Sequence, residues 1–338
     1  MLAELEAGVA ATRVDIREVG LREGLQSHGS VLETAEKLEI YSGLHAAGCR
    51  EMNVVAFVSP KRMPQMADPE GFLRGLAQEP HLREGVVLSA LVPNERGLDR
   101  ALAMREEGLL DTVFVVFSES ATTLSANGMI AAQDSLLDEI ERWAGRARDG
   151  GLNVSTFVSA SYGCSVEGPV DPARVVEHAA RLQGMSGVDE VIISDSTGQA
   201  DPLQVLRLLT ALAEVLPVDQ RLGVHFHDTR GAGLANVFAA LASPFEHLVV
   251  DAAFGGWGGD WPFVPEAFGN VATEDVVEML VGLGFDPGID VAVIQAVTKA
   301  YAARTERAVS AKLTDAAPIG WKRDRNPARA VHAARAGG

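Results

Sequence analysis

Cysteine and positive charge are both scarce in this chain of 338 residues. Its only cysteines are Cys49 and Cys164, too few for a disulfide framework and typical of a reducing compartment. Acidic residues outnumber Lys and Arg by 46 to 29, which gives a formal net charge of −17. Nucleic-acid-binding proteins normally carry a basic surface, so this charge argues against a nucleic-acid partner. It does not exclude an anionic small molecule, because a local basic cluster or a cation can offset the overall charge.

Long apolar runs are also missing. No stretch of the sequence approaches the ~20 consecutive apolar residues that a membrane-spanning helix requires. The segment from Met1 to Ala11 lacks the positive region and apolar core that define a signal peptide. We therefore expect a cytoplasmic protein that has no membrane partner.

Short apolar segments alternate with helical patterns along most of the chain. The apolar segments are rich in Val, Ile and Phe and mostly lack strict alternation, which is typical of parallel strands buried on both faces. The predicted strands are Val14–Gly20, Glu51–Phe57, Val86–Pro93, Thr112–Ser118, Asn153–Ala160, Glu190–Asp195, Arg221–His227 and Leu248–Phe254. The predicted helices between them are Leu32–Ala47, Glu70–Gln78, Glu95–Glu107, Gln133–Asp149, Pro172–Gln183, Pro202–Val215 and Gly233–Ala242.

Eight strand–helix units ending near Phe254 predict an α/β fold, the (β/α)8 TIM barrel, which typically takes about 250 residues. A doubly wound open sheet is the competing arrangement. The segment Gly20-Leu-Arg-Glu-Gly24 after the first strand does not fit the Gly-rich dinucleotide fingerprint, so the barrel is favoured.

The chain beyond the eighth strand predicts two further parts. We expect residues 1–272 to form the catalytic barrel domain and residues 273–314 to form a C-terminal helical extension. That extension contains the helical patterns Thr273–Gly284 and Asp290–Val309. Residues 315–338 are rich in Pro, Arg and Ala with little periodicity, which predicts an irregular tail.

The segment Val224-His-Phe-His-Asp228 closes the seventh predicted strand and carries two histidines. Residues two apart in a strand project from the same face, so His225 and His227 point one way and their apolar neighbours point the other. Two neutral imidazoles side by side are typical ligands of a divalent metal. Paired core histidines that hydrogen-bond to their neighbours are the alternative, and the local pattern leaves both interpretations open.

Polar and charged residues gather where the predicted strands end. In a TIM barrel the chemistry takes place at the carboxyl ends of the strands and in the loops that follow them. The residues concerned are Arg22 and Glu23, Asn53, Lys61 and Arg62, Ser159 and Ser161, Asp195, His225 and His227, Asp260 and Asn270. Packing alone does not require carboxylates, imidazoles and guanidinium groups at one rim, so we expect a functional site there.

Several separated blocks of the sequence carry a family resemblance. They are Glu18-Val-Gly-Leu-Arg-Glu-Gly-Leu-Gln26, Phe57-Val-Ser-Pro-Lys61, Tyr162-Gly-Cys-Ser-Val-Glu-Gly168, Val224-His-Phe-His-Asp-Thr229 and Gly269-Asn-Val-Ala-Thr-Glu-Asp275. From about Val14 to Leu313 the chain resembles hydroxymethylglutaryl-CoA lyase, within the wider metallolyase group that shares this barrel. The resemblance implies a carbon–carbon lyase that cleaves a 3-hydroxy-acyl-CoA to an acyl-CoA and a keto acid. It also implies a homodimer.

The resemblance further implies a Mg²⁺ or Mn²⁺ ion, with CoA present as part of the substrate. The ligands carried over from the family are Glu23, His225, His227 and Asn270. Oxygen and imidazole ligands, with waters completing an octahedron, suit a hard or borderline divalent ion. A ligand set without cysteine is less suited to structural zinc.

In that chemistry the ion lowers the pKa of the substrate hydroxyl, and a base takes its proton. The resemblance points to His225 or Glu23 as the base. Arg22 would stabilise the enolate oxygen that develops when the carbon–carbon bond breaks. The alternative for Arg22 is an ion pair with Asp195 or with another carboxylate at the rim.

Four residues are predicted to contact the substrate, and three of them have a simpler alternative. Gln26 resembles a substrate-side residue of the family, but it could only shape a turn. Lys61, together with Arg62, would bind the phosphates or pantetheine of CoA, or it could be a solvated surface charge. Asn53 and Asp195 complete the set, and Asn53 could be no more than a polar residue of the barrel interior.

Three residues depart from the family pattern. Glu23 stands where the family has Asp, and its extra methylene moves the carboxylate by roughly 1.5 Å. Asn53 replaces a buried Glu, so one negative charge near the cation is missing. In the Gly-rich loop Gly256-Trp-Gly-Gly-Asp260-Trp-Pro262, Asp260 replaces the cysteine that protonates the enolate carbon in the family.

The Gly-rich loop is expected to act as a flexible lid over the site. Asp260 could donate a proton if desolvation by Trp257 and Trp261 raised its pKa, or it could bind a polar substrate group, or cap a turn. The two tryptophans also predict an acyl group that is bulkier or more apolar than methylglutaryl.

Two rival functions stay open on the sequence. A condensing acyltransferase would join an acyl-CoA to a keto acid with the same ion and arginine. A catalytically silent paralogue that binds metal and CoA is favoured by the replaced cysteine and opposed by Arg22, His225, His227 and Asn270.

The role of Asp260 as a proton donor is tested by Asp260→Asn, which keeps the side-chain shape but removes the acid. If Asp260 donates the proton, kcat should fall by about 100-fold or more, as for other general acids. Steady-state turnover of the acyl-CoA substrate measures this change. An unchanged kcat would contradict the proton-donor role.

Overall fold

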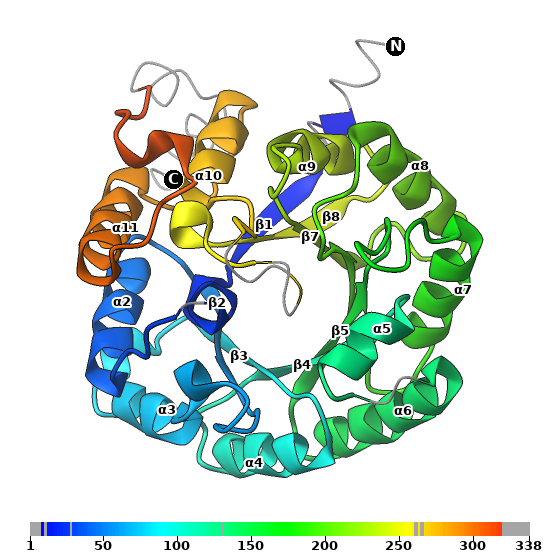
Figure 1. The fold of residues 1–338 in the computed structure, drawn as a ribbon, viewed down its shortest axis with the longest axis horizontal. Helices are drawn as coiled ribbons and strands as arrows, with labels where there is room; N and C mark the ends of the chain where they lie inside the picture. Colours follow the sequence, from blue (N-terminus) through cyan, green and yellow to red (C-terminus); the bar gives the residue numbers. More distant parts are fainter. Residues whose placement is uncertain are drawn as a thin grey trace, which may run out of the picture.

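The computed structural model describes residues 8–9, 12–27, 29–129, 132–259, 263 and 267–319 of the chain. Its centre is a closed barrel of eight parallel strands in the order β1 to β8, with β8 paired back to β1 (Figure 1). The strands are β1 (Arg13–Glu18), β2 (Glu51–Ala56), β3 (Val87–Leu91), β4 (Thr112–Ser118), β5 (Asn153–Ser159), β6 (Glu190–Asp195), β7 (Arg221–Phe226) and β8 (His247–Ala252). The predicted TIM barrel is confirmed.

Helices surround the barrel as an outer ring (Figure 1). They are α2 (Thr34–Ala46), α3 (Pro69–Ala77), α4 (Glu95–Glu106), α6 (Gln133–Asp149), α7 (Pro172–Gln183), α8 (Pro202–Leu212), α9 (Gly233–Leu241), α10 (Thr273–Gly282) and α11 (Val291–Thr305). The short helix α5 (Ala121–Ala126) lies inside this ring, next to β4 and β5 (Figure 1). None of these helices is long and apolar enough to cross a membrane. The two helices predicted after β8 are present as α10 and α11, while the proposed boundary at residue 272 stays a prediction.

Many helix starts are fixed by a side chain that accepts a backbone N–H, as N-cap residues do. Asp68 caps α3, Asn94 caps α4, Ser120 caps α5, Asp171 caps α7, Asp201 caps α8 and Asp290 caps α11. Helix α5 was not predicted, because six residues of Ala, Thr, Leu and Ser give no clear helical period. A single π-helical turn, Gly20–Gly24, that directly follows β1 was not predicted either.

The lower interior of the barrel holds a fully buried guanidinium, that of Arg17 on β1. Its nitrogen atoms contact Glu51 Oε1 at 2.7 Å, Glu190 Oε2 at 2.5 Å and Asp251 Oδ1 at 2.9 Å. The guanidinium also lies over the ring of Phe114, 4.7 Å from its centroid. Burial alone would lower the pKa of Arg17, but the three carboxylates together raise it, so the side chain stays charged.

Arg221, at the start of β7, completes this charged cluster. Its guanidinium bonds to Glu51 and, at 3.1 Å, to Glu190 Oε1. Two guanidinium groups and three carboxylates therefore tie β1, β2, β6, β7 and β8 together across the barrel interior. The opposite charges of the cluster compensate one another, because an unpaired charge buried away from water would destabilise the barrel.

Replacing Arg17 with Met should lower the free energy of unfolding by about 3–5 kcal/mol, because three carboxylates would lose their central cation. The matched control is Arg13→Met, on the same strand, where the exposed ion pair with Asp15 stabilises by about 0–1 kcal/mol. Urea unfolding followed by circular dichroism measures both variants. Equal effects of the two substitutions would show that the buried cluster does not stabilise the barrel.

Candidate functional site

Two histidines lie at the carboxyl end of β7 and point the same way. His225 is in the strand, and His227 follows it and bridges to Asn270 through the backbone. Their Nε2 atoms are 3.1 Å apart, and both side chains are buried. The prediction that the two imidazoles share one face of β7 is therefore confirmed.

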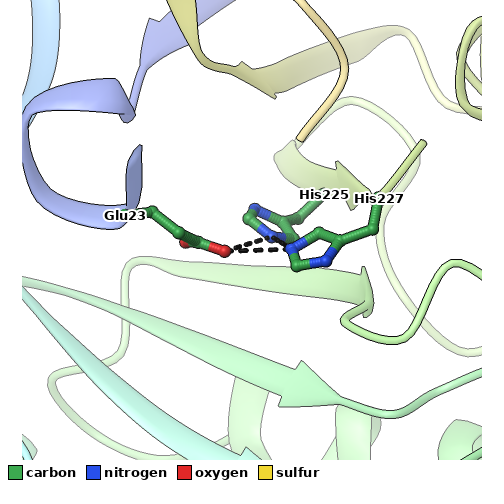
Figure 2. A group of neighbouring side chains, drawn as sticks. All are labelled: Glu23, His225 and His227. Carbon is green, nitrogen blue, oxygen red and sulfur yellow. Dashed lines mark hydrogen bonds and ion pairs between the residues drawn. The ribbon is translucent and has the colours of Figure 1, made fainter. Parts of the chain in front are cut away.

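Glu23 faces the two imidazoles from the turn after β1, two strands along the barrel from β7 (Figure 2). Its Oε1 atom lies 3.0 Å from His227 Nε2 and 3.3 Å from His225 Nε2. Glu23 belongs to the π-helical turn after β1, in which its backbone N–H bonds to Val19 O at 2.8 Å. A π-helical turn is rare and is often found at functional sites, and here it directs the Glu23 carboxylate into the barrel.

The charges of this cluster depend on one another. Burial alone would raise the pKa of Glu23, but His225 and the adjacent Arg22 hold it well below its usual range. Burial alone would lower the pKa of His225, but the Glu23 carboxylate and Asp251 raise it to about 9. Without a cation, a proton on His225 thus balances the Glu23 carboxylate.

Asp251 on β8 fixes the orientation of His225. Its Oδ2 atom is 3.0 Å from His225 Nδ1, and its Oδ1 atom accepts from Arg17 at 2.9 Å. The ring of His225 also packs edge-on against Phe157, with centroids 5.4 Å apart. Only Nε2 of His225 is therefore free to serve the site, as a metal ligand or as a base but not as both at one moment.

Arg22 is held by two neighbours. Its Nε donates to Asn53 Oδ1 at 2.5 Å, and its Nη1 is 3.0 Å from Glu23 Oε2. Asn53 in turn donates to Ser89 Oγ at 3.0 Å, so its amide is held in place and orients the guanidinium. The predicted ion pair between Arg22 and a rim carboxylate is therefore present, but the partner is Glu23 and not Asp195.

A cavity of about 260 Å³ opens above the strand ends, beside this cluster. It is lined by Arg22, Glu23, His225 and His227, and also by Gln26 and Arg62. Four serines, Ser59, Ser159, Ser194 and Ser196, add hydroxyl groups to its wall. The cavity therefore joins a charged cluster to a space large enough for part of a small molecule.

Other predicted site residues lie elsewhere in the described part of the chain. Lys61 is exposed and does not line the cavity, whereas its neighbour Arg62 does. Asp195 is buried, and its two oxygen atoms accept the backbone N–H groups of Gln199 and Ala200, both at 2.9 Å. This pairing gives Asp195 a turn-holding role, so its contact with a substrate stays an untested prediction.

Asp260 and Trp261 lie outside the described residues, but the start of the Gly-rich loop is described. Trp257 is fully buried, where it packs edge-on against Phe254 and Tyr301 and donates from Nε1 to Ala308 O at 2.8 Å. The expectation that Trp257 acts from a mobile lid on an acyl group is wrong, because its side chain is packed beneath the C-terminal segment.

Two positioning residues were missed by the sequence analysis. Asp251 belongs to no motif that the sequence shows, and its contact with His225 depends on the pairing of β7 with β8. Arg307, after α11, donates to Gly24 O at 3.0 Å and to Gly258 O at 2.8 Å. It thereby ties the Gly-rich loop to the turn that carries Glu23, although the two segments are distant in sequence.

The residues present fit a divalent metal ion. Glu23, His225 and His227 each offer one ligand atom, and these atoms all lie within 4.8 Å of one another. Asn270 donates from Nδ2 to Trp257 O at 2.9 Å, while its Oδ1 atom is buried with no partner among the described residues. A carboxylate, two imidazoles and an amide oxygen are ligands suited to Mg²⁺ or Mn²⁺, and such an ion would replace the shared proton.

Comparison with known proteins gives concordant results. (R)-citramalyl-CoA lyase of Chloroflexus aurantiacus is 36% identical over 315 residues, covering 90% of this chain and 95% of that protein. The mitochondrial hydroxymethylglutaryl-CoA lyase of Rattus norvegicus is 37% identical over 283 residues, which cover 84% of this chain and 83% of that protein. The crystal structure of hydroxymethylglutaryl-CoA lyase from Pseudomonas aeruginosa superposes with a TM-score of 0.81 at 33% identity. The superposition covers 90% of this chain and 97% of that one.

These similarities confirm both the predicted resemblance and the prediction of a lyase-type enzyme. The family model described as HMGL-like matches residues 13–300, which is most of the chain. The protein belongs to the HMGL-like family.

Proposed function

We propose that this protein is a divalent-metal-dependent lyase that cleaves a 3-hydroxy-acyl-CoA, of the hydroxymethylglutaryl-CoA type, to an acyl-CoA and a keto acid. The observation that carries the proposal is the convergence of Glu23, His225 and His227 at the barrel mouth, with Arg22 held beside them. The names of the relatives support it, since they are acyl-CoA lyases that cover most of the chain.

Glu23, His225 and His227, with Asn270 as the fourth candidate, would hold Mg²⁺ or Mn²⁺ at this point. When bound, such an ion supplies Lewis-acid chemistry that lowers the pKa of a substrate hydroxyl. The proton of that hydroxyl could pass to His225 Nε2 or to a carboxylate oxygen of Glu23, provided that the accepting atom does not hold the ion at that moment. Asp251 keeps His225 in the orientation that either task requires.

Arg22 supplies the fixed positive charge that the reaction needs. Breaking the carbon–carbon bond leaves an enolate on the thioester, and its oxygen becomes negative as the bond breaks. The contacts with Asn53 and Glu23 hold the guanidinium at the cavity wall before substrate arrives. A cation placed in advance stabilises the developing charge without reorganising.

CoA requires a local positive charge in a chain whose net charge is −17. Arg62 lies at the cavity wall and donates to the backbone carbonyls of Asn127 and Ala126 at the end of α5. Lys61 is exposed next to it. Together they form the basic pair that would meet the phosphates or pantetheine of CoA.

Incubation with hydroxymethylglutaryl-CoA and Mg²⁺ or Mn²⁺ should release acetyl-CoA and acetoacetate, because the charged cluster provides the functions that the reaction requires. Removal of metal with EDTA should reduce turnover to background, and added Mg²⁺ or Mn²⁺ should restore it. A coupled acetoacetate assay measures both effects. Failure to cleave any 3-hydroxy-acyl-CoA, with metal bound, would support a silent paralogue. Product formation only in the reverse direction would support a condensing enzyme.

Metal binding itself is tested by His227→Ala, measured by titration calorimetry with Mn²⁺. Loss of a direct ligand should weaken Mn²⁺ binding by about 100-fold or more, since even residues behind the ligands contribute 10- to 100-fold. The matched control is His81→Ala, at an exposed histidine remote from the cavity, which should leave the affinity unchanged. If both variants bind Mn²⁺ like the unaltered protein, the metal site lies elsewhere.

A further inference from the structure

The cavity has two chemically different halves. The polar half, described above, comes from the ends of β5, β6 and β7 and from the π-helical turn after β1 and the residues that follow it. The other half lies on the side of β3, β4 and β5, where apolar side chains line the space. We propose that this apolar wall, made of Leu91, Val116, Phe157, Val58, Met63 and Met129, binds an apolar substituent larger than methyl on the hydroxyl-bearing carbon of the substrate. The inference rests on the proposed lyase function and names the acyl group that it would take.

The inner part of the wall lies inside the barrel. Val116 is more exposed than any other residue of β4, although β4 has strands on both sides. Leu91, at the end of β3, is likewise only partly buried. Both side chains line the cavity. Apolar side chains that remain accessible within a closed barrel face a space that is not filled by the protein itself.

Phe157 places this inner wall directly beside the charged cluster. Its ring lies edge-on to that of His225, with centroids 5.4 Å apart, and also packs edge-on against Phe114 at 5.5 Å. A substrate whose hydroxyl oxygen lies at His225 therefore has its hydroxyl-bearing carbon close to Phe157. The third substituent of that carbon can then extend along the apolar side.

The outer part of the wall continues towards the barrel mouth. Val58 and Met63 come from the segment after β2, and Met129 follows α5. Inner and outer parts line one cavity, so the apolar surface extends from the strand ends to the loops. This extent exceeds what a methyl group would cover.

Polar side chains on this side of the cavity are already engaged. Asn94 Oδ1 accepts from Gly97 N at 3.0 Å, as the N-cap of α4. Thr123 Oγ1 donates to Ser120 Oγ at 3.0 Å, and Asn127 Nδ2 donates to Thr123 O at 2.9 Å. Arg62, the cation at the outer end of this side, donates to the backbone carbonyls of Asn127 and Ala126. A carboxylate placed farther in, against Leu91 and Val116, would lose water without reaching that guanidinium, so an apolar chain is the better match there.

The charged and polar groups of the substrate have suitable partners on the opposite side. Arg22 and Gln26 line that side, and Gln26 Oε1 is buried with no partner among the described residues. The hydroxyls of Ser159 and Ser194 both contact that of Ser196, at 2.5 and 3.0 Å. The cavity therefore separates the oxygen atoms of the substrate from its apolar chain.

The test is a series of 3-hydroxy-3-alkylglutaryl-CoA thioesters with methyl, ethyl, butyl or hexyl at carbon three. Each added methylene that enters the wall should raise kcat/KM by ~4-fold until the wall is filled. Calorimetric affinities of the same thioesters give a readout that does not depend on turnover. If the methyl compound is cleaved and longer chains neither bind nor react better, the inference fails while the lyase function stands. If no thioester of the series is cleaved, the proposed lyase function is wrong. In that case the measured affinities still test the inference, which is wrong if affinity does not rise with chain length.

Two variants connect the effect to the wall. Val116→Phe should fill the inner end and reduce kcat/KM and affinity for the hexyl compound at least 10-fold more than for the methyl compound. Met129 lies in a loop, which tolerates substitutions better than a barrel strand does, and Met129→Ser should lower the preference for the hexyl over the methyl compound by several-fold. Val87→Phe, at an exposed position at the start of β3, is the matched control and should alter neither substrate. An equal change for all thioesters would assign the wall to the pantetheine arm and overturn the inference.

Discussion

One contact connects the stability of the barrel to its site, the carboxylate of Asp251 between Arg17 and His225. Strand register places the three residues side by side, since Arg17 pairs with Asp251 across β1 and β8, and Asp251 pairs with His225 across β8 and β7. The buried guanidinium below thus fixes the carboxylate, and the carboxylate fixes the imidazole above. The direction in which His225 presents Nε2 is set by the same charges that hold the barrel interior together.

The barrel also explains how one cavity can have two chemical characters. Each strand contributes its own end and its own loop, so neighbouring strands can supply different side chains without disturbing the ladder between them. Here β7 and the turn after β1 bring the histidines and Glu23, while β3 and β4 bring Leu91 and Val116. An ion pair cluster and an apolar surface then meet at Phe157, which contacts His225 from the apolar side.

The barrel could be predicted from the sequence, because short apolar segments alternate regularly with helical patterns along the chain. The placement of His225 and His227 on one face could also be predicted, since that follows from the period of two in a strand. Glu23 came from a resemblance, and the π-helical turn that aims it has no sequence signature that we recognised. Asp251 could not be found at all, because its role depends on register between strands. The role predicted for Trp257 in the lid was wrong, since the sequence does not show that the C-terminal segment covers this side chain.

Glu23 connects two parts of the site through the two oxygen atoms of its carboxylate. The side chain reaches both imidazoles through Oε1, while Oε2 contacts Arg22. One carboxylate therefore joins the candidate metal ligands to the guanidinium that would stabilise an enolate. Asn53 contributes to the same arrangement, because a neutral amide accepts from Arg22 without competing with Glu23 for its charge. Glu23 and Asn53 are thus coupled through Arg22, and Glu23 is the carboxylate that this guanidinium contacts at the rim.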